Sequence, residues 1–436
     1  MADIKEKMLI SYKEPDFIEK IKAFSFRRSA EKIRLSLTDS KEAQSVLKIL
    51  RNVAEHGDEA VSEYTNTYDE VDLQPGQFRV GTEEMEKAHK EIDGELLKSI
   101  KQAIENVRAY QEEIFIGDSG SKGIKYVPIR RVGVCVPGAA APLPSTVIMT
   151  VVPAQVAGVE EIAVVSPPRF KGGIHPVILG VCFELGISEV YKIGGAQAVA
   201  ALAFGTETVK NVSKIVGPGN IWVQMAKKFV SGNCAAIDSI AGPSEVLILA
   251  GEEANPSWVA ADMLSQAEHA DDSWAVMVTD SELLAAQVCE ELTKQLKGLT
   301  RKDAAEKSLE GFGAIIVMED IQSAVKFAND FAAEHLQIMC GSKSREISDL
   351  IENAGAVFVG EYTPVAVGDY WAGPSHTLPT GQAARFASAL TSNDFLKSIS
   401  MIEYDKDQLS ADAEHIVRLA EIEGLDAHAK SVRIRQ

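Results

Sequence analysis

Four side chains in the second half of the chain have the chemistry to bind a divalent metal ion: Gln266, His269, Asp369 and His428. Gln266 and His269 lie near the end of a predicted helix, and their spacing puts them on one face of it. Two imidazoles, one carboxylate and one amide suit zinc or a neighbouring first-row ion better than magnesium, which prefers all-oxygen sites. Taken alone, a Gln-x-x-His pair is more often a solvated helix end than a metal site.

A glutamate and a histidine that are adjacent in sequence, Glu334 and His335, are candidates for proton transfer. They follow a predicted helix and precede the apolar residues 336–339. Catalytic acids and bases are common at such boundaries, and the pKa of imidazole suits it to repeated proton transfer. The alternative is that both residues are structural.

Two glycine-rich loops each follow a predicted strand and precede a helix. One ends in Gln197 and the other is Gly217-Pro218-Gly219-Asn220. Glycine at such a place lets backbone N–H groups and the helix dipole face a phosphate. The loops therefore predict a nucleotide site, although neither has the Gly-x-Gly-x-x-Gly pattern, and two tight turns are the alternative.

Composition limits the class of protein and its partners. With 436 residues, 46% hydrophobic and 25% charged, the chain is expected to be soluble and globular with two or more domains. A net charge of -19 argues against nucleic acid or an anionic membrane as the main partner. The five cysteines are far apart and odd in number, which predicts reduced core residues in a cytoplasmic protein. We expect no secretory signal, and the longest apolar run, 147–168, is too interrupted to span a membrane.

The elements that must position these residues alternate between strand and helix after about residue 126. Residues 158–162 resemble 186–190, and each segment leads into an apolar strand. Their separation matches one βα unit, so a parallel sheet is expected. A second α/β region resumes after residue 245, and the segment 130–240 looks like an insertion between its parts.

Outside this region the chain is mainly helical. Apolar spacing predicts helices at 41–56, ended by Gly57, and at 83–110. Asn255 and Pro256 predict the start of the helix that carries Gln266. The tail after about 385 is too short for a core of its own, so we expect it to pack on another surface.

Eight ordered motifs link the chain to a known family: PGAAAPLPSTVIM, GGAQAVAALAFGTETV, KIVGPGN, AIDSIAGPSEVL, LSQAEH, FAAEHL, GDYWAGPSHTLPT and EIEGLDAH. On these motifs the sequence resembles the histidinol dehydrogenase family, zinc-dependent enzymes that oxidise L-histidinol to L-histidine in two NAD-dependent steps. The resemblance runs from about Ile33 to Arg435.

The resemblance implies a role for each matching position. Glu334 and His335 would be the catalytic pair, with His335 shuttling protons and Glu334 activating the water that attacks the aldehyde. The zinc, one per subunit, would be held by Gln266, His269, Asp369 and the partner subunit's His428. Substrate contacts would come from these four residues together with His335, Ser244, His376 and Glu423, and cofactor contacts with NAD from Cys135, Gln197 and Asn220.

The resemblance also implies the fold and the assembly. The family consists of homodimers with shared active sites, whose subunits have two incomplete Rossmann-like α/β domains with parallel sheets, one inserted in the other, plus small helical terminal elements. For this chain we expect an N-terminal helical element at 1–30, a first Rossmann-like domain at 31–132 and 246–385, the inserted cofactor domain at 133–245, and a C-terminal tail at 386–436.

Four residues depart from the family pattern, so more than one substrate is compatible with the sequence. Val365 stands where glutamate is usual, Ser375 where asparagine is usual, Cys135 replaces a tyrosine and Ala139 a glycine. Loss of a carboxylate from a dry pocket changes which substrates bind. A relative that oxidises another small alcohol, such as sulfopropanediol, to its acid is therefore the alternative. A non-catalytic metal-binding relative is a third hypothesis, which the intact Glu334-His335 pair opposes, and the choice between NAD and NADP is open.

Overall fold

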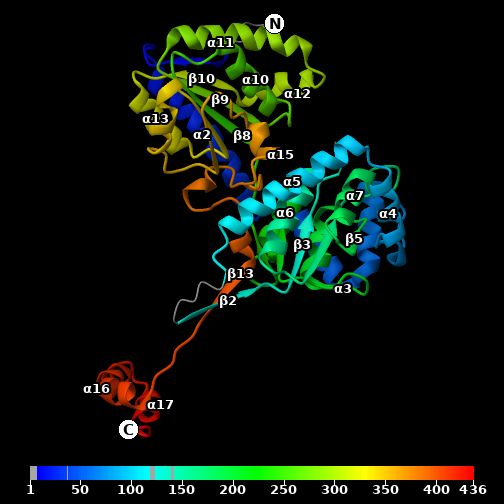
Figure 1. The fold of residues 1–436 in the computed structure, drawn as a ribbon, viewed down its shortest axis with the longest axis vertical. Helices are drawn as coiled ribbons and strands as arrows, with labels where there is room; N and C mark the ends of the chain where they lie inside the picture. The colour runs from blue at the N-terminus through cyan, green and yellow to red at the C-terminus, as the bar shows by residue number, and fades with distance from the viewer. Residues whose placement is uncertain (1–6, 37, 118–122, 139–141) are drawn as a thin grey trace. The chain divides into compact units, whose positions relative to one another are not determined.

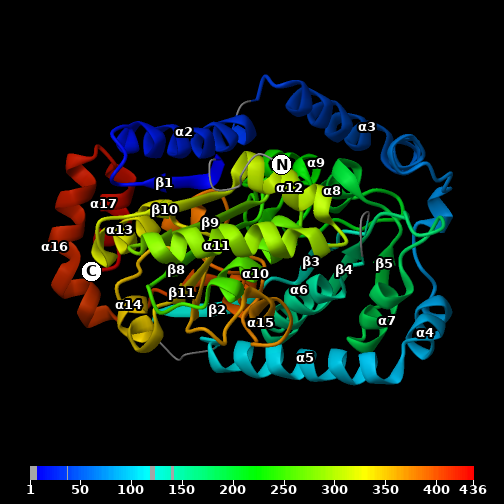
Figure 2. The same cartoon turned by 90° about the horizontal axis from the view of Figure 1, so that it is seen from above.

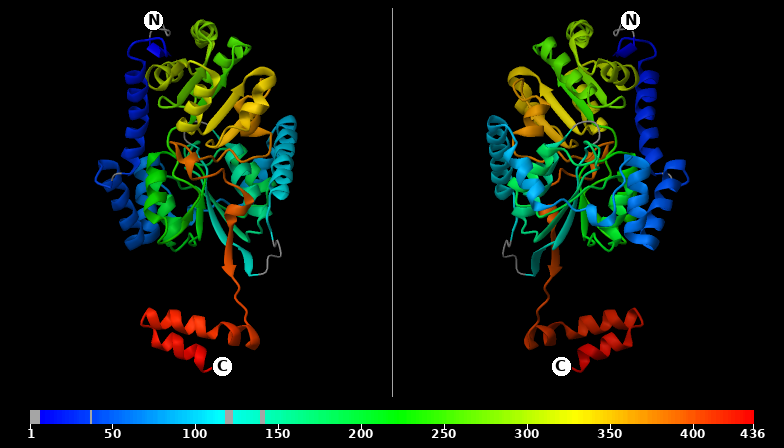
Figure 3. Two further views of the ribbon diagram at one scale, coloured as in Figure 1. Left: turned by 90° about the vertical axis from the view of Figure 1, so that its left-hand side faces the viewer. Right: turned by 90° about the vertical axis from the view of Figure 1, so that its right-hand side faces the viewer.

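The computed structural model of the chain describes residues 7–36, 38–117, 123–138 and 142–436. These residues divide into two compact units. The larger one comprises Met1–Phe115 and Ile129–Phe395, and the smaller one Ile116–Pro128 and Leu396–Gln436. Figures 1 and 3 show that the larger unit contains two sheets, each covered by helices.

The first sheet of the larger unit has six strands, and every neighbouring pair is parallel. Its spatial order is β1 (Leu9–Ser11), β10 (Ala314–Val317), β9 (Trp274–Thr279), β8 (Glu245–Ala250), β11 (His335–Met339) and β12 (Ala356–Val359). A parallel sheet of this kind is buried on both faces, which is why its strands are almost continuously apolar.

Helices cover both faces of this first sheet (Figure 1). One face shares a core with α10 (Pro256–Ala267), α11 (Glu282–Gln295) and α12 (Lys302–Phe312). The other shares a core with α2 (Phe17–Ser36), α13 (Ile321–Phe331) and α14 (Ser344–Ser348). The helix α15 (Val365–Tyr370) follows β12, and short 3-10 turns lie at Pro75–Gln77, Leu296–Gly298, Gly341–Lys343, Ala383–Arg385 and Ser392–Phe395.

The second sheet has five parallel strands. Its order is β5 (Glu189–Tyr191), β4 (Glu161–Val165), β3 (Arg131–Cys135), β6 (Lys214–Val216) and β7 (Ala236–Ile237). Its helices are α6 (Pro144–Val156), α7 (Pro176–Glu184), α8 (Gly195–Phe204) and α9 (Ile221–Val230), joined by α3 (Lys41–Asp69), α4 (Thr82–Lys90) and α5 (Gly94–Glu113). Figure 2 shows α3 and α5 on opposite sides of this sheet.

The predicted α/β fold with two parallel sheets is confirmed, but three N-terminal elements differ from expectation. The strand β1 was not predicted, and it forms one edge of the first sheet. The helix α3 continues through Gly57, which kinks it (φ 53°) instead of ending it. The predicted helix at 83–110 is two helices, because the side chain of Asp93 caps the start of α5.

The helix α3 also packs differently from our expectation. We placed residues 31–132 with the first sheet, yet buried side chains of α3 join the core of the second sheet through α8 and α9. The exact domain boundaries remain a prediction.

The smaller unit contains a two-stranded antiparallel sheet and two helices. β2 (Ile124–Pro128) pairs with β13 (Leu396–Ser400), and α16 (Lys406–Ile422) packs on α17 (Asp426–Arg433). Val417, Ala420 and Ala429 form a small buried apolar cluster in this helix pair, and Ala413 is buried as well. Such a small core agrees with the prediction that the tail cannot support itself, although β13 was not predicted.

Two further predictions concern cysteines and membranes. All five cysteines are free, and four are buried, but Cys234 is exposed, contrary to the expectation of core positions. Among the described residues, no helix combines the length and the apolar character needed to cross a bilayer.

One ion-pair cluster links three strands of the second sheet and predicts an acid-sensitive contribution to stability. Arg131 donates to both carboxylate oxygens of Glu189 at 2.8 Å and to Glu161 at 2.9 Å. The hydrogen bond from Arg131 is the main reason why the pKa of Glu189 falls from 4.5 to about 2. The ionised form of Glu189 therefore stabilises the fold at any pH above its unfolded-state pKa, and this contribution is lost as the pH falls from 4.5 towards about 2.

The Glu189→Gln variant should therefore be less stable than the wild type at neutral pH. We expect a loss of about 2 kcal/mol in the free energy of unfolding, after allowance for partial solvent screening. Urea denaturation of both proteins at neutral and at acid pH measures the difference. An equal difference at both pH values would contradict the ion-pair explanation.

Candidate functional site

The predicted catalytic residues lie at the amino edge of the first sheet, where β8 and β11 begin. Ser244 directly precedes β8, and Glu334 directly precedes β11, whose first residue is His335. The two strands are adjacent and parallel, with His335 opposite Val246, so their starts lie side by side. The pairing of two parallel strands thus brings together residues that are 90 positions apart in sequence.

The Glu334 side chain is held in a dry environment. It is 6% exposed, and one carboxylate oxygen accepts the backbone N–H of Glu245 at 2.8 Å. Burial raises the pKa of Glu334 well above its usual value of 4.5, although hydrogen bonds from Glu245 N–H and the Ser244 hydroxyl oppose the shift. Burial therefore favours the protonated form of Glu334, and a neighbouring positive charge would favour the carboxylate.

His335 has one ring nitrogen fixed and the other free. Nδ1 lies 3.1 Å from the carbonyl oxygen of Glu245. Because a carbonyl can only accept, Nδ1 carries the proton. Burial lowers the pKa of His335 to about 3, so the ring is neutral. Nε2 therefore keeps its lone pair, is buried without a hydrogen-bond partner among the described residues, and lies 4.0 Å from Asp369 Oδ1.

The predicted metal ligands of the larger unit come from α10 and α15. Gln266, in the last turn of α10, is 2% exposed, and its amide nitrogen has no partner among the described residues. His269 lies just beyond the end of α10, so the two do not share one helical face as predicted. Its Nδ1 is 2.8 Å from the Ser265 carbonyl, which leaves Nε2 for another ligand.

Asp369 is electrostatically coupled to His269. Burial raises the pKa of Asp369 to about 6, and His269 opposes this shift. The pKa values of His335 and His376 are also lowered in part by His269, after burial as the main cause. These four titratable side chains therefore lie within electrostatic range of one another.

The donor chemistry of this cluster fits a zinc ion whose coordination is completed by further ligands. In the described ranges, no group of three His, Cys, Asp or Glu side chains is arranged to hold a metal alone. Of the predicted ligands, the larger unit contributes only His269 and Asp369 from those types, with Gln266 as an amide donor. An amide, a carboxylate and an imidazole, without any thiolate, are donors expected for a catalytic rather than a structural zinc.

A small cavity adjoins these residues. It has a volume of about 120 Å³ and is lined by His335, Asp369 and His376, among others. Nδ1 of His376 donates to the Asp369 carbonyl at 3.2 Å, and burial lowers the pKa of His376 to about 4. The ring is therefore neutral, and its Nε2 is available to a ligand.

The structure shows the contacts of two residues that depart from the family pattern, Val365 and Ser375. Val365 is 5% exposed and shares the apolar core of the first sheet with Phe358. Ser375 is 2% exposed, and its hydroxyl donates to the Met149 carbonyl at 2.9 Å, which ties its loop to α6. Ala139 lies outside the described residues.

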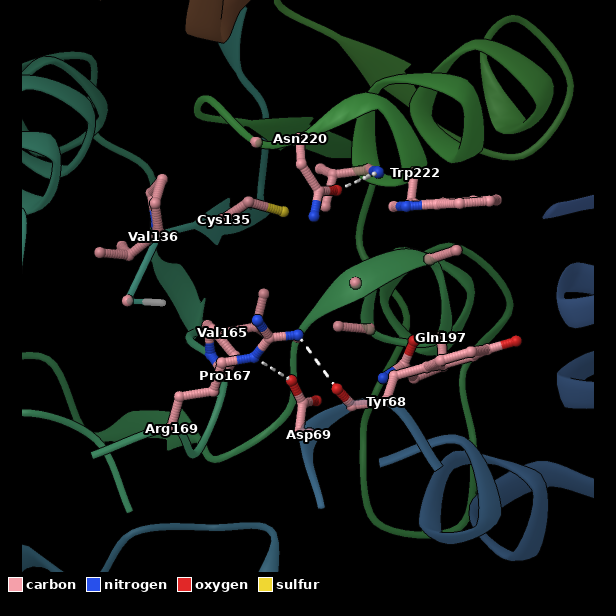
Figure 4. A pocket seen from close by; sticks show the side chains of 18 of the residues that line it. Tyr68, Asp69, Cys135, Val136, Val165, Pro167, Arg169, Gln197, Asn220 and Trp222 are labelled. Atoms are coloured by element: carbon pink, nitrogen blue, oxygen red, sulfur yellow. Dashed lines mark hydrogen bonds and ion pairs between the residues drawn. The ribbon is translucent and has the colours of Figure 1, made fainter. Parts of the chain in front are cut away.

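The predicted cofactor residues line one large pocket at the carboxyl edge of the second sheet (Figure 4). Cys135, Gln197 and Asn220 all face this cavity of about 500 Å³. Helices α8 and α9 both begin there, and Asn220 caps α9 by accepting the Val223 N–H at 3.3 Å. Burial raises the pKa of the Cys135 thiol to about 12, so it is uncharged. Two helix N-termini give the pocket a positive potential suited to a phosphate.

Glycine is required at the second of the predicted loops. Gly217 has a φ of +106°, and a Cβ there would lie 2.3 Å from the Cys135 carbonyl oxygen. Any side chain would therefore be strained and would collide with β3. The loop is also held by Asp238, whose carboxylate accepts the Gly217 N–H at 2.7 Å, and by Lys227, which donates to the Gly217 carbonyl at 2.9 Å.

The pair Lys227 and Asp238, which sequence reasoning missed, predicts a measurable effect on both stability and cofactor binding. The two form an ion pair with side chains only 1% and 3% exposed. Asp238→Asn would leave the Lys227 charge buried and unpaired, which costs about 3–5 kcal/mol of stability. We expect urea denaturation to detect this loss and NADH fluorescence titration to show weaker binding.

The exposed pair of Lys307 and Asp271 is the matched control, since its side chains are 65% and 60% exposed. Asp271→Asn should change stability by less than about 1 kcal/mol. Equal effects of the two variants would contradict the structural role of the buried pair.

Other side chains at the cofactor pocket were also missed. Arg169 donates to Asp69 at 2.7 Å and to the Tyr68 carbonyl at 3.1 Å, and all three line the cavity (Figure 4). Asp69 ends α3 and Arg169 follows β4, so only the folded chain brings them together. No sequence signal distinguished them from other surface charges.

Two predicted residues belong to the smaller unit. Glu423 is the C-terminal cap of α16, and His428 lies in the first turn of α17. Both are exposed within their unit. Their roles toward substrate and zinc remain predictions.

Comparison with known proteins gives one consistent family. The family model described as histidinol dehydrogenase matches residues 33–436. A curated histidinol dehydrogenase from Geobacillus kaustophilus is 43% identical over 417 residues, covering 94% of this chain and 97% of the relative. One from Rhodopirellula baltica is 47% identical over 397 residues, covering 89% and 85%. The crystal structure of histidinol dehydrogenase from Elizabethkingia anophelis superposes with a TM-score of 0.86 at 35% identity, covering 92% of this chain and 93% of that one.

Proposed function

This chain belongs to the histidinol dehydrogenase family, and from that premise we propose that it oxidises L-histidinol through the aldehyde to L-histidine in histidine biosynthesis. The proposal includes zinc and NAD as cofactors. The observation that carries it is the neutral His335 ring, whose free Nε2 faces the cavity that Asp369 and His376 also line.

His335 is suited to take the protons that the alcohol loses. Oxidation of an alcohol to an acid needs two hydride transfers with a water addition between them, and each oxidation also releases a proton. Because Nδ1 donates to the Glu245 carbonyl, the lone pair of Nε2 is the acceptor for the hydroxyl proton in both oxidations. Bound zinc would orient the substrate with its positive charge, while NAD would accept the hydride.

Glu334 is suited to the water addition. Burial raises the pKa of Glu334, and a cation nearby would lower it and favour the carboxylate form. The carboxylate can then take a proton from the water that attacks the aldehyde. Its hydrogen bonds from Ser244 and from the Glu245 N–H fix its position for this step.

Helix dipoles favour cations at the amino edge of the first sheet and anions at the carboxyl edge of the second sheet. The C-terminal ends of α10 and α13 lie beside Gln266 and Glu334, and the negative end of a helix dipole favours cations such as zinc or an amino alcohol. The N-terminal ends of α8 and α9 favour the phosphates of a dinucleotide instead. An anionic alcohol such as sulfopropanediol is less suited to the first edge.

We propose that the active enzyme is a homodimer with shared sites. Among the predicted metal ligands the larger unit supplies one imidazole, that of His269, and the partner subunit's His428 would supply the second. Glu423, three residues before the start of α17, would reach the substrate in the same way. An acidic side chain suits the charged amino group of histidinol.

Steady-state assays test the substrate. Zinc-loaded protein is supplied with NAD and either L-histidinol or sulfopropanediol, and NADH absorbance is followed. We expect two NADH per histidine formed from histidinol and none from the sulfonated diol. Turnover of the diol in the absence of histidinol turnover would make the substrate assignment wrong, and repeating the assay with NADP decides between the two nucleotides.

A further inference from the structure

A buried ion pair behind the catalytic residues has no role in the chemistry described above. Arg28 on α2 and Glu245 at the start of β8 are each 2% exposed. The guanidinium contacts the carboxylate through two nitrogens, with Nε 3.1 Å from one oxygen and Nη2 on the other. This two-pronged geometry is specific to arginine and orients both partners.

Glu245 contacts both catalytic residues through its backbone. Its N–H donates to Glu334 at 2.8 Å, and its carbonyl accepts Nδ1–H of His335 at 3.1 Å. A single peptide segment therefore fixes the carboxyl of one residue and the tautomer of the other. Any rotation of this segment would disturb both contacts together.

Arg28 also contacts the end of α13 through Phe331. Its Nη1 donates to the carbonyl of Phe331, and its guanidinium carbon lies 3.4 Å from the centre of the Phe331 ring. Phe331 ends α13, three residues before Glu334. The Gly381 N–H donates to Glu245 at 3.2 Å and adds a third segment. Arg28 thus links α2, the start of β8 and the end of α13.

We propose that Arg28 and Glu245 form a positioning pair, which holds Glu334 in place and keeps the His335 proton on Nδ1 so that Nε2 faces the substrate. The proposal rests on the proposed function for its kinetic test. Partners behind a catalytic residue typically contribute about 10- to 100-fold to activity when they orient it. The pair acts on the groups that transfer protons and most of the proposed substrate contacts lie on other residues, so kcat should fall by a larger factor than KM changes.

The variants are chosen to separate positioning from folding. Arg28→Lys keeps the charge paired but loses the two-pronged geometry, Glu245→Gln keeps the size, and Arg28→Ala removes the side chain. The matched controls are Arg131→Lys, Glu189→Gln and Arg131→Ala, because Arg131 and Glu189 form a similar two-pronged pair in the second sheet. Thermal unfolding, kcat and both KM values are measured for each.

We expect kcat to fall about 10- to 100-fold in the Arg28 and Glu245 variants at temperatures where they are folded, with a smaller change in KM. The controls should lose stability without losing kcat. A cavity of about 340 Å³ adjoins Arg28 and Glu245, so millimolar guanidinium should restore kcat to Arg28→Ala. Unchanged kcat in Arg28→Lys and Glu245→Gln, or a fall that the controls share, would overturn the proposal.

A spectroscopic measurement makes the test independent of turnover. In protein with ¹⁵N-labelled histidines, the His335 ring signals are identified by their absence from His335→Asn. We expect an Nδ1–H tautomer in the wild type and a mixture of tautomers in Glu245→Gln. An unchanged His335 signal would overturn the positioning role. If wild-type protein did not oxidise histidinol, the proposed function would be wrong. The His335 spectrum would still show whether Arg28 and Glu245 set the tautomer of His335.

Discussion

The His335→Asn variant is expected to lose about 100- to 10,000-fold in kcat for histidinol oxidation, the usual contribution of a positioned general base. Asparagine can still donate its amide N–H to the Glu245 carbonyl, so the fold around it is preserved. It offers no lone pair of imidazole basicity where Nε2 lies, and the hydroxyl proton then has no acceptor. Steady-state assays of NADH formation give kcat, and thermal unfolding verifies the fold.

A histidine elsewhere provides the matched control for this prediction. His56 is exposed on α3 with its ring beside the Asn52 carbonyl, and α3 packs on the core of the second sheet, whereas His335 belongs to the first. His56→Asn should leave kcat unchanged. A His335→Asn enzyme with wild-type turnover would show that another group takes the proton, and His376 would be the first to test.

Removal of zinc has the second large expected effect. Treatment with a strong chelator should abolish turnover, and added zinc should restore it, because the amide, imidazole and carboxylate donors form a site only around the ion. Asp369→Asn should prevent restoration, since a neutral amide replaces the only carboxylate of the set. Metal analysis of the same samples by mass spectrometry relates activity to zinc content.

Two controls accompany this experiment. Asp272→Asn, in the exposed turn after α10, should respond to chelator and zinc as the wild type does. Chelator-treated protein should keep its far-UV circular dichroism, since both sheets have cores of their own. Full activity in protein shown to be free of metal would rule out the hypothesis that turnover depends on zinc.

The sequence predicted the parts of the site whose signals are local. The cap formed by Asn255 and Pro256 marked the start of α10 correctly, and glycine loops ending in Gln197 and Asn220 proved to line one pocket. Both signals depend on residues within one turn of each other. The boundary between α13 and β11 placed Glu334 and His335 at the edge of a sheet for the same reason.

The sequence could not predict the contacts that hold the site together over long distances. Arg28 and Glu245 are 217 positions apart, and nothing in the local sequence of either indicates that they form a pair. Asp262 and Gln337 form a similar link at 2.6 Å, which ties α10 to β11 one turn before Gln266. Arginine and glutamate are usually exposed, so only the strand order reveals that these particular ones are covered.

The edge strand β1 was missed for a related reason. It has three residues, Leu9–Ser11, too few to show alternation, and its partner β10 begins at Ala314. Tertiary pairing alone decides its structure. Family resemblance supplied the roles of Ser244 and His376, which no pattern of the residues themselves would have shown.

The pairing of β1 with β10 also has a consequence for how the chain is made. During synthesis the ribosome releases β1 and α2 some 300 residues before their partner strand exists. The core of the second sheet, drawn from residues 43–235, is complete earlier and is expected to fold first. The partners of Arg28, Glu245 and Phe331, are made after this core, so we expect the edge that carries Glu334 and His335 to be assembled last.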